Sequence, residues 1–296
     1  MYKIIRSGLF DLFDLISNIK NWYSVILFKY GILKKATFIT KNNTKAEIKT
    51  MSDYYDFFNS SLIWWNQKLS HYGNRISIQK NVVIFDDKIK FIYHNKEDFS
   101  KTMHAVHDVF LSNEYKVGVN NKNIVDIGAN IGDTALYFMS KGANSVVGFE
   151  LFPNTFEVAQ ENIKLNDAQK NIKILNFGVD GSKSEIFIHR NVVKSNTDNI
   201  NYALKNKDGG LRKKVKIITL EDIIERFGKP NQILKIDCEG CEYGIILKSK
   251  PSVLRSFEEI ILEYHGDSRS LEERLSNAGF EVEIHKNIMH ARLVNV

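Results

Sequence analysis

Acidic side chains and one histidine follow two apolar runs in the C-terminal half of the chain. Asp237 and Glu239 come after the first run, and Glu263 and His265 close the second. Because the carboxyl ends of adjacent parallel strands meet at one edge of a sheet, we expect these four side chains to converge on one crevice. A carboxylate or an imidazole there could take a proton from a hydroxyl nucleophile. Our hypothesis is that Asp237 or Glu239 positions and deprotonates an acceptor, with His265 assisting.

Two other interpretations of this acidic group are open. Its oxygen and nitrogen atoms could hold a divalent ion, but carboxylate clusters are also common without metal, and we do not favour one. Strand-end carboxylates can also cap the next helix, as Glu242 would for a helix over 243–247.

A glycine loop in the middle of the chain is the second feature that could do chemistry. An apolar run ends at Gly128-Ala129-Asn130-Ile131-Gly132, and a helix is expected from Asp133. Glycines there let the backbone turn sharply and approach a ligand closely. Glu150 ends the next apolar run, where a carboxylate can accept hydrogen bonds from both hydroxyls of a ribose.

The loop favours S-adenosylmethionine over a dinucleotide. A pyrophosphate site typically has G-x-G-x-x-G, whereas here Gly128 and Gly132 enclose Asn130. Asp133, at the start of the helix, would repel a pyrophosphate. A ligand with a sulfonium and an ammonium group suits Asp126 and Asp133 better. The sequence therefore predicts a methyl donor and disfavours an NAD-dependent oxidoreductase.

The elements that must position these residues alternate from residue 123 onward. We expect strands over 124–127, 145–149, 172–177, 232–236 and 259–262, and helices over 133–140, 154–165, 220–227 and 271–278. This alternation predicts an α/β fold whose parallel sheet is covered on both faces. A closing hairpin of 280–284 and 291–294 would add antiparallel strands to one edge. Residues 181–214 are interpreted as a polar loop that could line an acceptor pocket.

The front of the chain lacks this alternation. We expect hairpins over 36–50 and 81–93, and helices over 52–58 and 101–111. The sequence therefore predicts a small, mixed helical and hairpin accessory region over residues 1–110, and a cofactor-binding domain over residues 111–296.

The net charge of +6 lies in the front of the chain, where residues 1–123 carry 18 basic and 11 acidic side chains against 23 and 24 in the remainder. Basic and aromatic residues together suit a nucleic acid, an anionic membrane or a sugar phosphate, but a solvated surface has the same composition. Because we find no nucleic-acid-binding motif, we do not favour nucleic acid as a partner. No pattern indicates an oligomeric state.

Apolar residues at helical spacing between Ile5 and Ile19 predict an N-terminal helix. The stretch is too short and too charged to span a bilayer, although it could bind a membrane surface. The two cysteines, Cys238 and Cys241, are too few for a disulfide framework. We therefore expect a reducing compartment and a cytoplasmic protein, with peripheral membrane contact as the alternative.

These motifs together resemble the FkbM family of S-adenosylmethionine-dependent methyltransferases. The resemblance covers roughly residues 110–284 and includes D-I-G-A-N-I-G-D from Asp126, G-F-E ending at Glu150, Asn162-x-x-x-Asn166, T-L-E-D from Thr219, K-I-D-x-E-G-x-E from Lys235, and L-E-Y-H ending at His265. It implies a class I methyltransferase fold with a Rossmann-like sheet. It also implies O-methylation of a hydroxyl on a carbohydrate, a glycolipid or a small natural product.

The resemblance further implies which residues hold the cofactor: Asp126, Gly128, Asn130, Gly132 and Glu150, to which we add their neighbours Ala129, Asp133 and Leu151. Asp180 has the usual place of a group near the adenine amine, and Tyr115 would close over the methionine end. The chain departs from the family pattern at Cys238 and Cys241, where small apolar residues are usual, and at Leu151, where proline is frequent. Although C-x-x-C spacing can serve zinc or redox sites, we expect two small buried side chains here.

Two functional alternatives stay open at this point. The basic front region could serve an RNA methyltransferase, whose nucleic-acid binding would weaken steeply with salt. A non-catalytic cofactor-binding scaffold is the other alternative. The acids from Asp237 to Glu242 argue against a scaffold, because a site without chemistry has no need of several neighbouring carboxylates.

Overall fold

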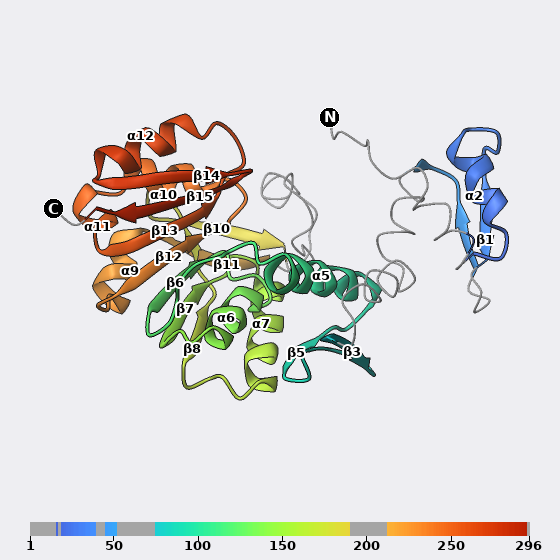
Figure 1. Ribbon diagram of the computed structural model, residues 1–296, viewed down its shortest axis with the longest axis horizontal. Helices are drawn as coiled ribbons and strands as arrows, with labels where there is room; N and C mark the ends of the chain where they lie inside the picture. The colour runs from blue at the N-terminus through green and yellow to red at the C-terminus, as the bar shows by residue number, and fades with distance from the viewer. Residues whose placement is uncertain (1–15, 17–18, 40–44, 52–74, 190–211, 295–296) are drawn as a thin grey trace. The chain divides into compact units, whose positions relative to one another are not determined.

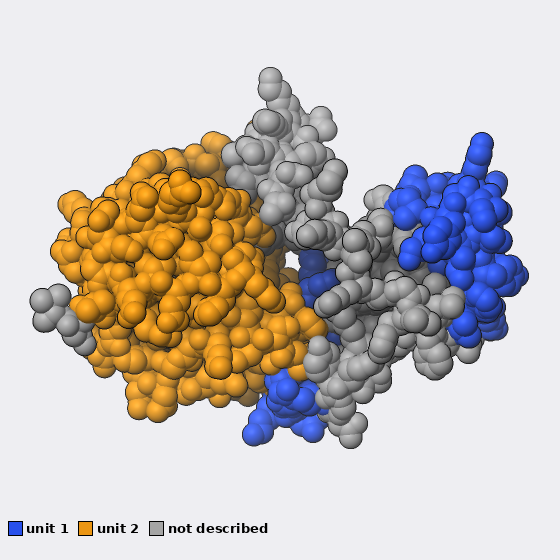
Figure 2. Space-filling view, turned by 45° about the horizontal axis from the view of Figure 1, so that its top comes forward, with its two compact units in different colours: residues 1–88, 93–104 blue, residues 89–92, 105–296 orange. Residues whose placement is uncertain are grey.

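A computed structural model describes residues 16, 19–39, 45–51, 75–189 and 212–294 (Figure 1). The chain divides into two compact units, coloured separately in Figure 2. The first comprises residues 1–88 and 93–104, and the second comprises residues 89–92 and 105–296. The expected helix over 52–58 and most of the expected N-terminal helix lie outside the described residues. Within the described residues, no helix combines the length and apolar character needed to cross a membrane.

The first unit contains a small α/β element and a separate hairpin. Helix α2 (Trp22–Lys29) packs on strand β1 (Ala36–Ile39), which pairs antiparallel with β2 (Lys45–Ile48), confirming the first expected hairpin. Its apolar core gathers Ile19, Val25, Phe28, Ala36, Phe38 and Ile48. Strand β3 (Ile76–Gln79), which the sequence did not predict, pairs antiparallel with β4 (Val82–Phe85).

The helix expected over 101–111 is longer and changes type. Helix α5 begins at Lys96 and ends at Val106, and a π-helical turn, η2 (His107–Leu111), continues it. π-Helical turns inside helices often occur near functional sites. Here the turn is followed shortly by Glu114 and Tyr115, which reach the candidate site described below.

The second unit is built on a seven-stranded sheet of order β14-β15-β13-β12-β6-β7-β8. Its strands are β6 (Asn123–Ile127), β7 (Ser145–Phe149), β8 (Ile172–Leu175), β12 (Gln232–Ile236), β13 (Phe257–Glu263), β14 (Phe280–His285) and β15 (Ile288–Leu293). The first five run parallel to one another, as the alternation predicted. The chain order therefore reverses between β6 and β12, and the crevice for a ligand in such a sheet lies beyond their carboxyl ends.

The closing hairpin joins the sheet in an unexpected way. Strand β15 inserts between β13 and β14 and is antiparallel to both, so β14 runs in the same direction as the central strands. Only one antiparallel strand therefore enters the sheet, and the edge strand is β14. This α/β sheet is the fold of class I methyltransferases, as expected.

Helices cover both faces of the sheet (Figure 1). One set comprises α6 (Asp133–Ser140), on β6 and β7, and α7 (Pro153–Leu165), on β8. The other set comprises α9 (Leu220–Phe227), α10 (Cys241–Lys248), α11 (Pro251–Leu254) and α12 (Arg269–Asn277). Apolar side chains of this second set, including Ile223, Ile245 and Leu271, share one core with the central strands. Thr219 caps α9 and Asp222 completes a capping box, which confirms the expected helix start.

A second small sheet lies within the stretch interpreted as a polar loop. Strand β9 (Gly178–Val179) runs parallel to β11 (Arg212–Ile218), which is antiparallel to β10 (Ser184–His189). The loop interpretation of 181–214 is therefore wrong at both ends, and residues 190–211 between them lie outside the described part of the chain. Ile186 of β10 and Ile217 of β11 line the candidate cofactor cavity.

Asn162 of α7 and Asn166, the C-cap residue of this helix, bind the backbone of strand β5 (Ile89–Ile92). The Asn162 side chain accepts a hydrogen bond from the Ile92 N–H, at 2.8 Å. The Asn166 side chain accepts from the Lys90 N–H and donates to the Lys90 carbonyl, at 2.9 and 2.7 Å. These side chains satisfy backbone groups in the way a neighbouring strand would.

Candidate functional site

The glycine loop after β6 approaches the end of β12 very closely. Gly128 has a φ of +78°, and a Cβ built on it would lie 1.7 Å from the carbonyl oxygen of Asp237. Any side chain at this position would therefore collide with backbone. The loop brings the predicted cofactor site and the predicted catalytic acids into direct contact, as the strand order requires.

The carboxylate of Glu150, at the end of β7, is buried and is held by two backbone amides. Oε2 accepts from the Asn130 N–H at 2.9 Å, and Oε1 accepts from the Phe152 N–H at 2.8 Å. These bonds fix the carboxylate at the rim of the glycine loop. A carboxylate oxygen can accept more than one hydrogen bond, so this group could also accept from a ligand hydroxyl.

A cavity of about 230 Å³ lies beside this carboxylate. Of the predicted cofactor residues it is lined by Gly128, Glu150, Leu151 and Asp180, and Glu239 lines it too. Its apolar wall includes Phe149, Phe177 and Ile217, which the sequence interpretation did not assign to the site. The residues missed in this way belong to or follow strands β7 and β8, or come from the small second sheet.

Other predicted cofactor residues lie around the loop without lining this cavity. Ala129 and Asp133 are buried, and Gly132 is the N-cap residue of α6. Tyr115 is also buried, and its hydroxyl donates to Oδ2 of Asp237 at 3.1 Å. Burial and the nearby carboxylate of Asp237 raise the pKa of the Tyr115 hydroxyl, so this group stays a hydrogen-bond donor.

Asp126 is part of a buried polar network with Lys235. Its Oδ2 accepts from the Thr134 hydroxyl at 2.5 Å, and its Oδ1 lies 3.1 Å from Nζ of Lys235. Lys235 also donates to the Gly128 carbonyl at 3.0 Å. This lysine, whose role the sequence did not reveal, ties the glycine loop to the middle of the sheet.

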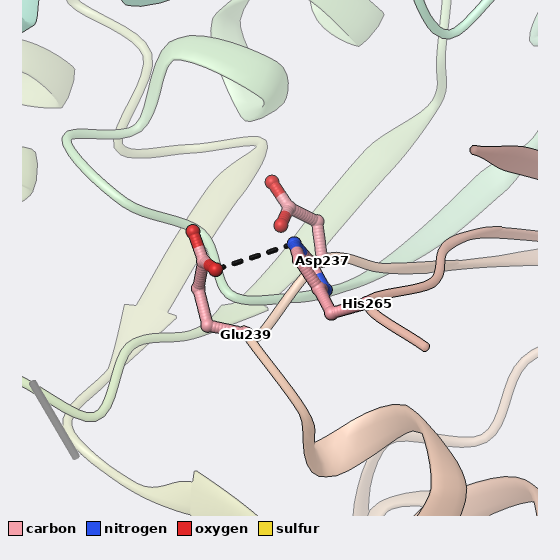
Figure 3. Close-up of side chains that lie close together, drawn as sticks. All are labelled: Asp237, Glu239 and His265. Atoms are coloured by element: carbon pink, nitrogen blue, oxygen red, sulfur yellow. Dashed lines mark ion pairs between the residues drawn. The ribbon is translucent and has the colours of Figure 1, made fainter. Parts of the chain in front are cut away.

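The predicted catalytic side chains meet at the carboxyl ends of β12 and β13. Figure 3 shows Asp237, Glu239 and His265 directed toward one another. Nε2 of His265 lies 3.2 Å from Oε2 of Glu239 and 3.8 Å from Oε1 of Glu263. The three side chains in Figure 3 offer ligand atoms that all lie within 4.8 Å of one another. Acidic groups with such spacing are common without an ion.

Glu242 orients the histidine. It is fully buried, its Oε1 accepts from the His265 backbone N–H at 3.0 Å, and the same atom lies 3.2 Å from Nδ1 of the ring. Its Oε2 accepts from the N–H of Gly240, the N-cap residue of α10, at 2.8 Å. Helix α10 therefore begins at Cys241, earlier than expected, and Glu242 lies in its first turn and is not the N-cap residue. Its histidine-orienting role was not indicated by the sequence.

The surroundings of the site raise the pKa of its histidine and of two of its carboxyl groups. The hydrogen bond to Glu242, opposed by burial and supported by Glu239 and Glu263, raises the pKa of His265 to about 9. Burial, with repulsion from Asp237 and Glu114, raises the pKa of Glu263 to about 7. Burial and repulsion from Asp108 and Asp237 raise the pKa of Glu114 to about 7. At neutral pH His265 is thus a cation, and two carboxyl groups can exchange protons.

The two cysteines are joined by a disulfide bond, Cys238–Cys241. The prediction of two small buried side chains is therefore wrong: both residues are half-buried and line the candidate cofactor cavity. C-x-x-C spacing allows a disulfide, a metal or neither, so spacing alone could not decide. The expectation of a reducing compartment, which rested on these residues, loses its basis.

The sequence of the chain is similar to those of known methyltransferases. The FkbM methyltransferase domain matches residues 126–282, just over half of the chain. Methyltransferase sdnD of Sordaria araneosa is 25% identical over 194 residues, which cover 55% of this chain and 75% of that protein.

Solved structures resemble the chain more distantly. Methyltransferase FkbM from Methylobacillus flagellatus is 12% identical with a TM-score of 0.42, covering 79% of this chain and 60% of that one. TrmK of M. capricolum, solved in complex with S-adenosyl-homocysteine, is 13% identical with a TM-score of 0.35, covering 62% of this chain and 66% of that one.

Proposed function

The chain belongs to the FkbM methyltransferase family, and on this premise we propose that it transfers the methyl group of S-adenosylmethionine to a hydroxyl oxygen of a carbohydrate-containing or other small hydroxylated acceptor. The observation that carries the proposal is the convergence of Asp237, Glu239 and Glu263 around His265, directly beside the glycine loop. Methylation of a hydroxyl, unlike methylation of a soft or already anionic atom, benefits from a group that takes the proton.

The residues around the cavity suit S-adenosylmethionine. The buried carboxylate of Glu150 can accept from the ribose hydroxyls, and Asp180 can accept from the adenine amine. The aromatic walls Phe149 and Phe177 suit the flat adenine ring. Gly128 lines the same cavity, next to the end of β12. When bound, S-adenosylmethionine supplies a methyl group that its sulfonium already activates.

In the proposed mechanism, Asp237 holds the acceptor hydroxyl at the end of β12, where the glycine loop comes closest to this strand. Holding the oxygen in line with the methyl group can lower the barrier by about 7 kcal/mol or more. As the oxygen attacks, its proton passes to the carboxylates, and Glu263 is the member whose pKa of about 7 matches neutral pH. His265, as an imidazolium, holds Glu239 in place and does not itself take the proton.

The sign of the charge argues for a neutral acceptor. Asp237, Glu239, Glu242 and Glu263 surround one histidine, and a phosphodiester would be repelled by such a group. We therefore favour a sugar or another uncharged hydroxyl compound over RNA, despite the basic front region. Peripheral membrane contact stays a prediction, and a glycolipid acceptor would be consistent with it.

A labelled-methyl transfer screen tests this function. The full chain is incubated with methyl-labelled S-adenosylmethionine and separate pools of oligosaccharides, glycolipids, small hydroxylated natural products and RNA. We expect label in an ether linkage of one hydroxylated pool. Label only in RNA, or on nitrogen or carbon, would contradict the proposal.

A variant then ties the activity to the site. Asp237→Asn misplaces the acceptor hydroxyl and should lower turnover by about 10²-fold or more, while calorimetry still detects binding of S-adenosylhomocysteine. Glu272→Gln, which removes an exposed carboxylate on α12, is the matched control and should leave turnover unchanged. Full turnover of Asp237→Asn would contradict the role proposed for Asp237.

A further inference from the structure

The disulfide between Cys238 and Cys241 closes a small covalent ring in the turn between β12 and α10, which carries Glu239. The two residues enclose only Glu239 and Gly240, between the end of β12 and the start of α10. Their Cα atoms lie 5.5 Å apart, a separation ordinary for disulfides. These are the two cysteines of the chain, so no other thiol can exchange with them intramolecularly.

The enclosed residues have unusual backbone conformations. Glu239 has a φ of +59° and Gly240 a φ of +115°. A non-glycine residue in the left-handed region persists when its surroundings hold it there. The covalent ring is one such constraint, and the hydrogen bond from Gly240 N–H to Glu242 is another. Glu239, whose carboxylate meets His265, is thus placed by a backbone that the disulfide helps to fix.

Both cysteines are also part of the candidate cofactor cavity. Cys238 and Cys241 line the same cavity as Gly128, Glu150 and Asp180. Both cysteines are half-buried, and a pocket that admits a ligand can admit a small thiol. A change at the sulfurs therefore alters the wall of the cavity and the position of Glu239 together.

We propose that Cys238 and Cys241 form a reversible thiol–disulfide site that controls cofactor binding and, through Glu239, methyl transfer. A dithiol reductant supplies two electrons and two protons. Its thiolate attacks one sulfur, the S–S bond breaks, and the reductant leaves as its own disulfide while both cysteines become thiols. An oxidised dithiol reverses the step. The disulfide form is the competent one, because it holds Glu239 beside His265; the dithiol form frees the loop.

This proposal depends on the cofactor cavity and not on which acceptor is methylated. Binding of S-adenosylhomocysteine reports it directly and needs no acceptor. Failure of the proposed O-methylation and failure of this switch are therefore distinguishable.

The experiment uses the full chain equilibrated with either reduced or oxidised dithiothreitol. Alkylation followed by intact mass measurement counts free thiols, and calorimetry measures the Kd for S-adenosylhomocysteine in each state. We expect both cysteines to be alkylated in the reduced protein and neither in the oxidised one. The Kd should be weaker by at least about tenfold in the reduced state, within the range usual for coupled equilibria.

A cysteine-free variant supplies the control. Cys238→Ala combined with Cys241→Ala should show the same Kd in both redox buffers. If this variant does not fold, the comparison of the two states of the unaltered chain still decides the question. Equal affinities in both states, or two free thiols after oxidation, would overturn the proposal. So would a variant without cysteines that still responds to the redox buffer.

Discussion

The Nζ atom of Lys235 lies 3.1 Å from Oδ1 of Asp126, and the exposed fraction of each side chain is 1% or less. Asp126 belongs to β6 and Lys235 to β12, so the pair bridges the two strands between which the chain order reverses. Lys235 also lies over the ring of Tyr115 and donates to the Gly128 carbonyl. One buried cation therefore contacts the glycine loop, a predicted cofactor-closing residue and the neighbourhood of Asp237.

Removing this cation should destabilise the protein strongly. Lys235→Met leaves the Asp126 carboxylate buried without its ion pair, which typically costs about 3–5 kcal/mol in the free energy of unfolding. Urea denaturation measures the difference. Lys122→Met is the matched control, because Lys122 pairs with the exposed Glu258 and should lose less than about 1 kcal/mol. Equal losses in the two variants would show that the buried pair does not stabilise the contact between β6 and β12.

Turnover should depend on pH with a maximum between about 7 and about 9. Below the first value Glu263 is protonated and cannot take a proton, so activity rises as the pH passes about 7. Above the second value His265 loses its charge and no longer holds Glu239, so activity falls as the pH passes about 9. A pH–rate profile of kcat with the identified acceptor checks both limits, which belong to the coupled group as a whole.

The acidic limit of that profile should disappear when Glu263 is neutralised. Glu263→Gln cannot titrate, so the rise near pH 7 should be lost while the fall near pH 9 persists. Binding of S-adenosylhomocysteine serves as the control for folding. A profile whose acidic limit is unmoved in this variant would assign the proton to another carboxylate.

An alanine in the glycine loop should abolish cofactor binding. Gly128→Ala places a Cβ 1.7 Å from the Asp237 carbonyl oxygen, so either the loop or the end of β12 must move. Gly31→Ala is the matched control, because Gly31 has a similar φ of +74° but no atom within 4 Å of the added Cβ. The control should lose about 1–2 kcal/mol of stability from backbone strain alone. Calorimetry should detect no S-adenosylhomocysteine binding to Gly128→Ala, and full affinity would contradict the close approach.

Chelation should leave methyl transfer intact. Nδ1 of His265 lies 3.2 Å from Oε1 of Glu242, and Nε2 lies 3.2 Å from Oε2 of Glu239, so both ring nitrogens already have partners within the cluster. We therefore expect unchanged turnover after dialysis against EDTA, measured with the labelled-methyl assay. Loss of activity that Mg²⁺ or Mn²⁺ restores would instead assign an ion to this cluster.

Most of the central sheet could be predicted because its signal is local. Apolar runs such as 124–127 and 232–236 lie between helical stretches and become the buried strands β6 and β12. The small second sheet was missed for the opposite reason. Strand β11 carries Arg212, Lys213 and Lys214 on exposed positions, so its composition is typical of a loop although its backbone pairs on both sides.

The sequence predicted where the candidate site lies, but it predicted few of the contacts that its side chains make. Strand-end positions brought Asp237, Glu239, Glu263 and His265 together, because parallel strands share an edge. Partners within the interior depend on three-dimensional packing, which a single sequence does not show. The sequence therefore did not predict the ion pair of Lys235 with Asp126, nor the disulfide between Cys238 and Cys241.

The hydrogen bonds from Asn162 and Asn166 to strand β5 have a practical consequence for dissecting the protein. A fragment that begins at residue 111, where the sequence places the domain boundary, would lack residues 89–92. It would expose a helix surface whose two amide side chains normally clasp a backbone at Ile92 and Lys90. We therefore expect a truncated protein to fold only when its first residue lies before Ile89. Strand β5 is then kept together with Asn162 and Asn166, which bind it.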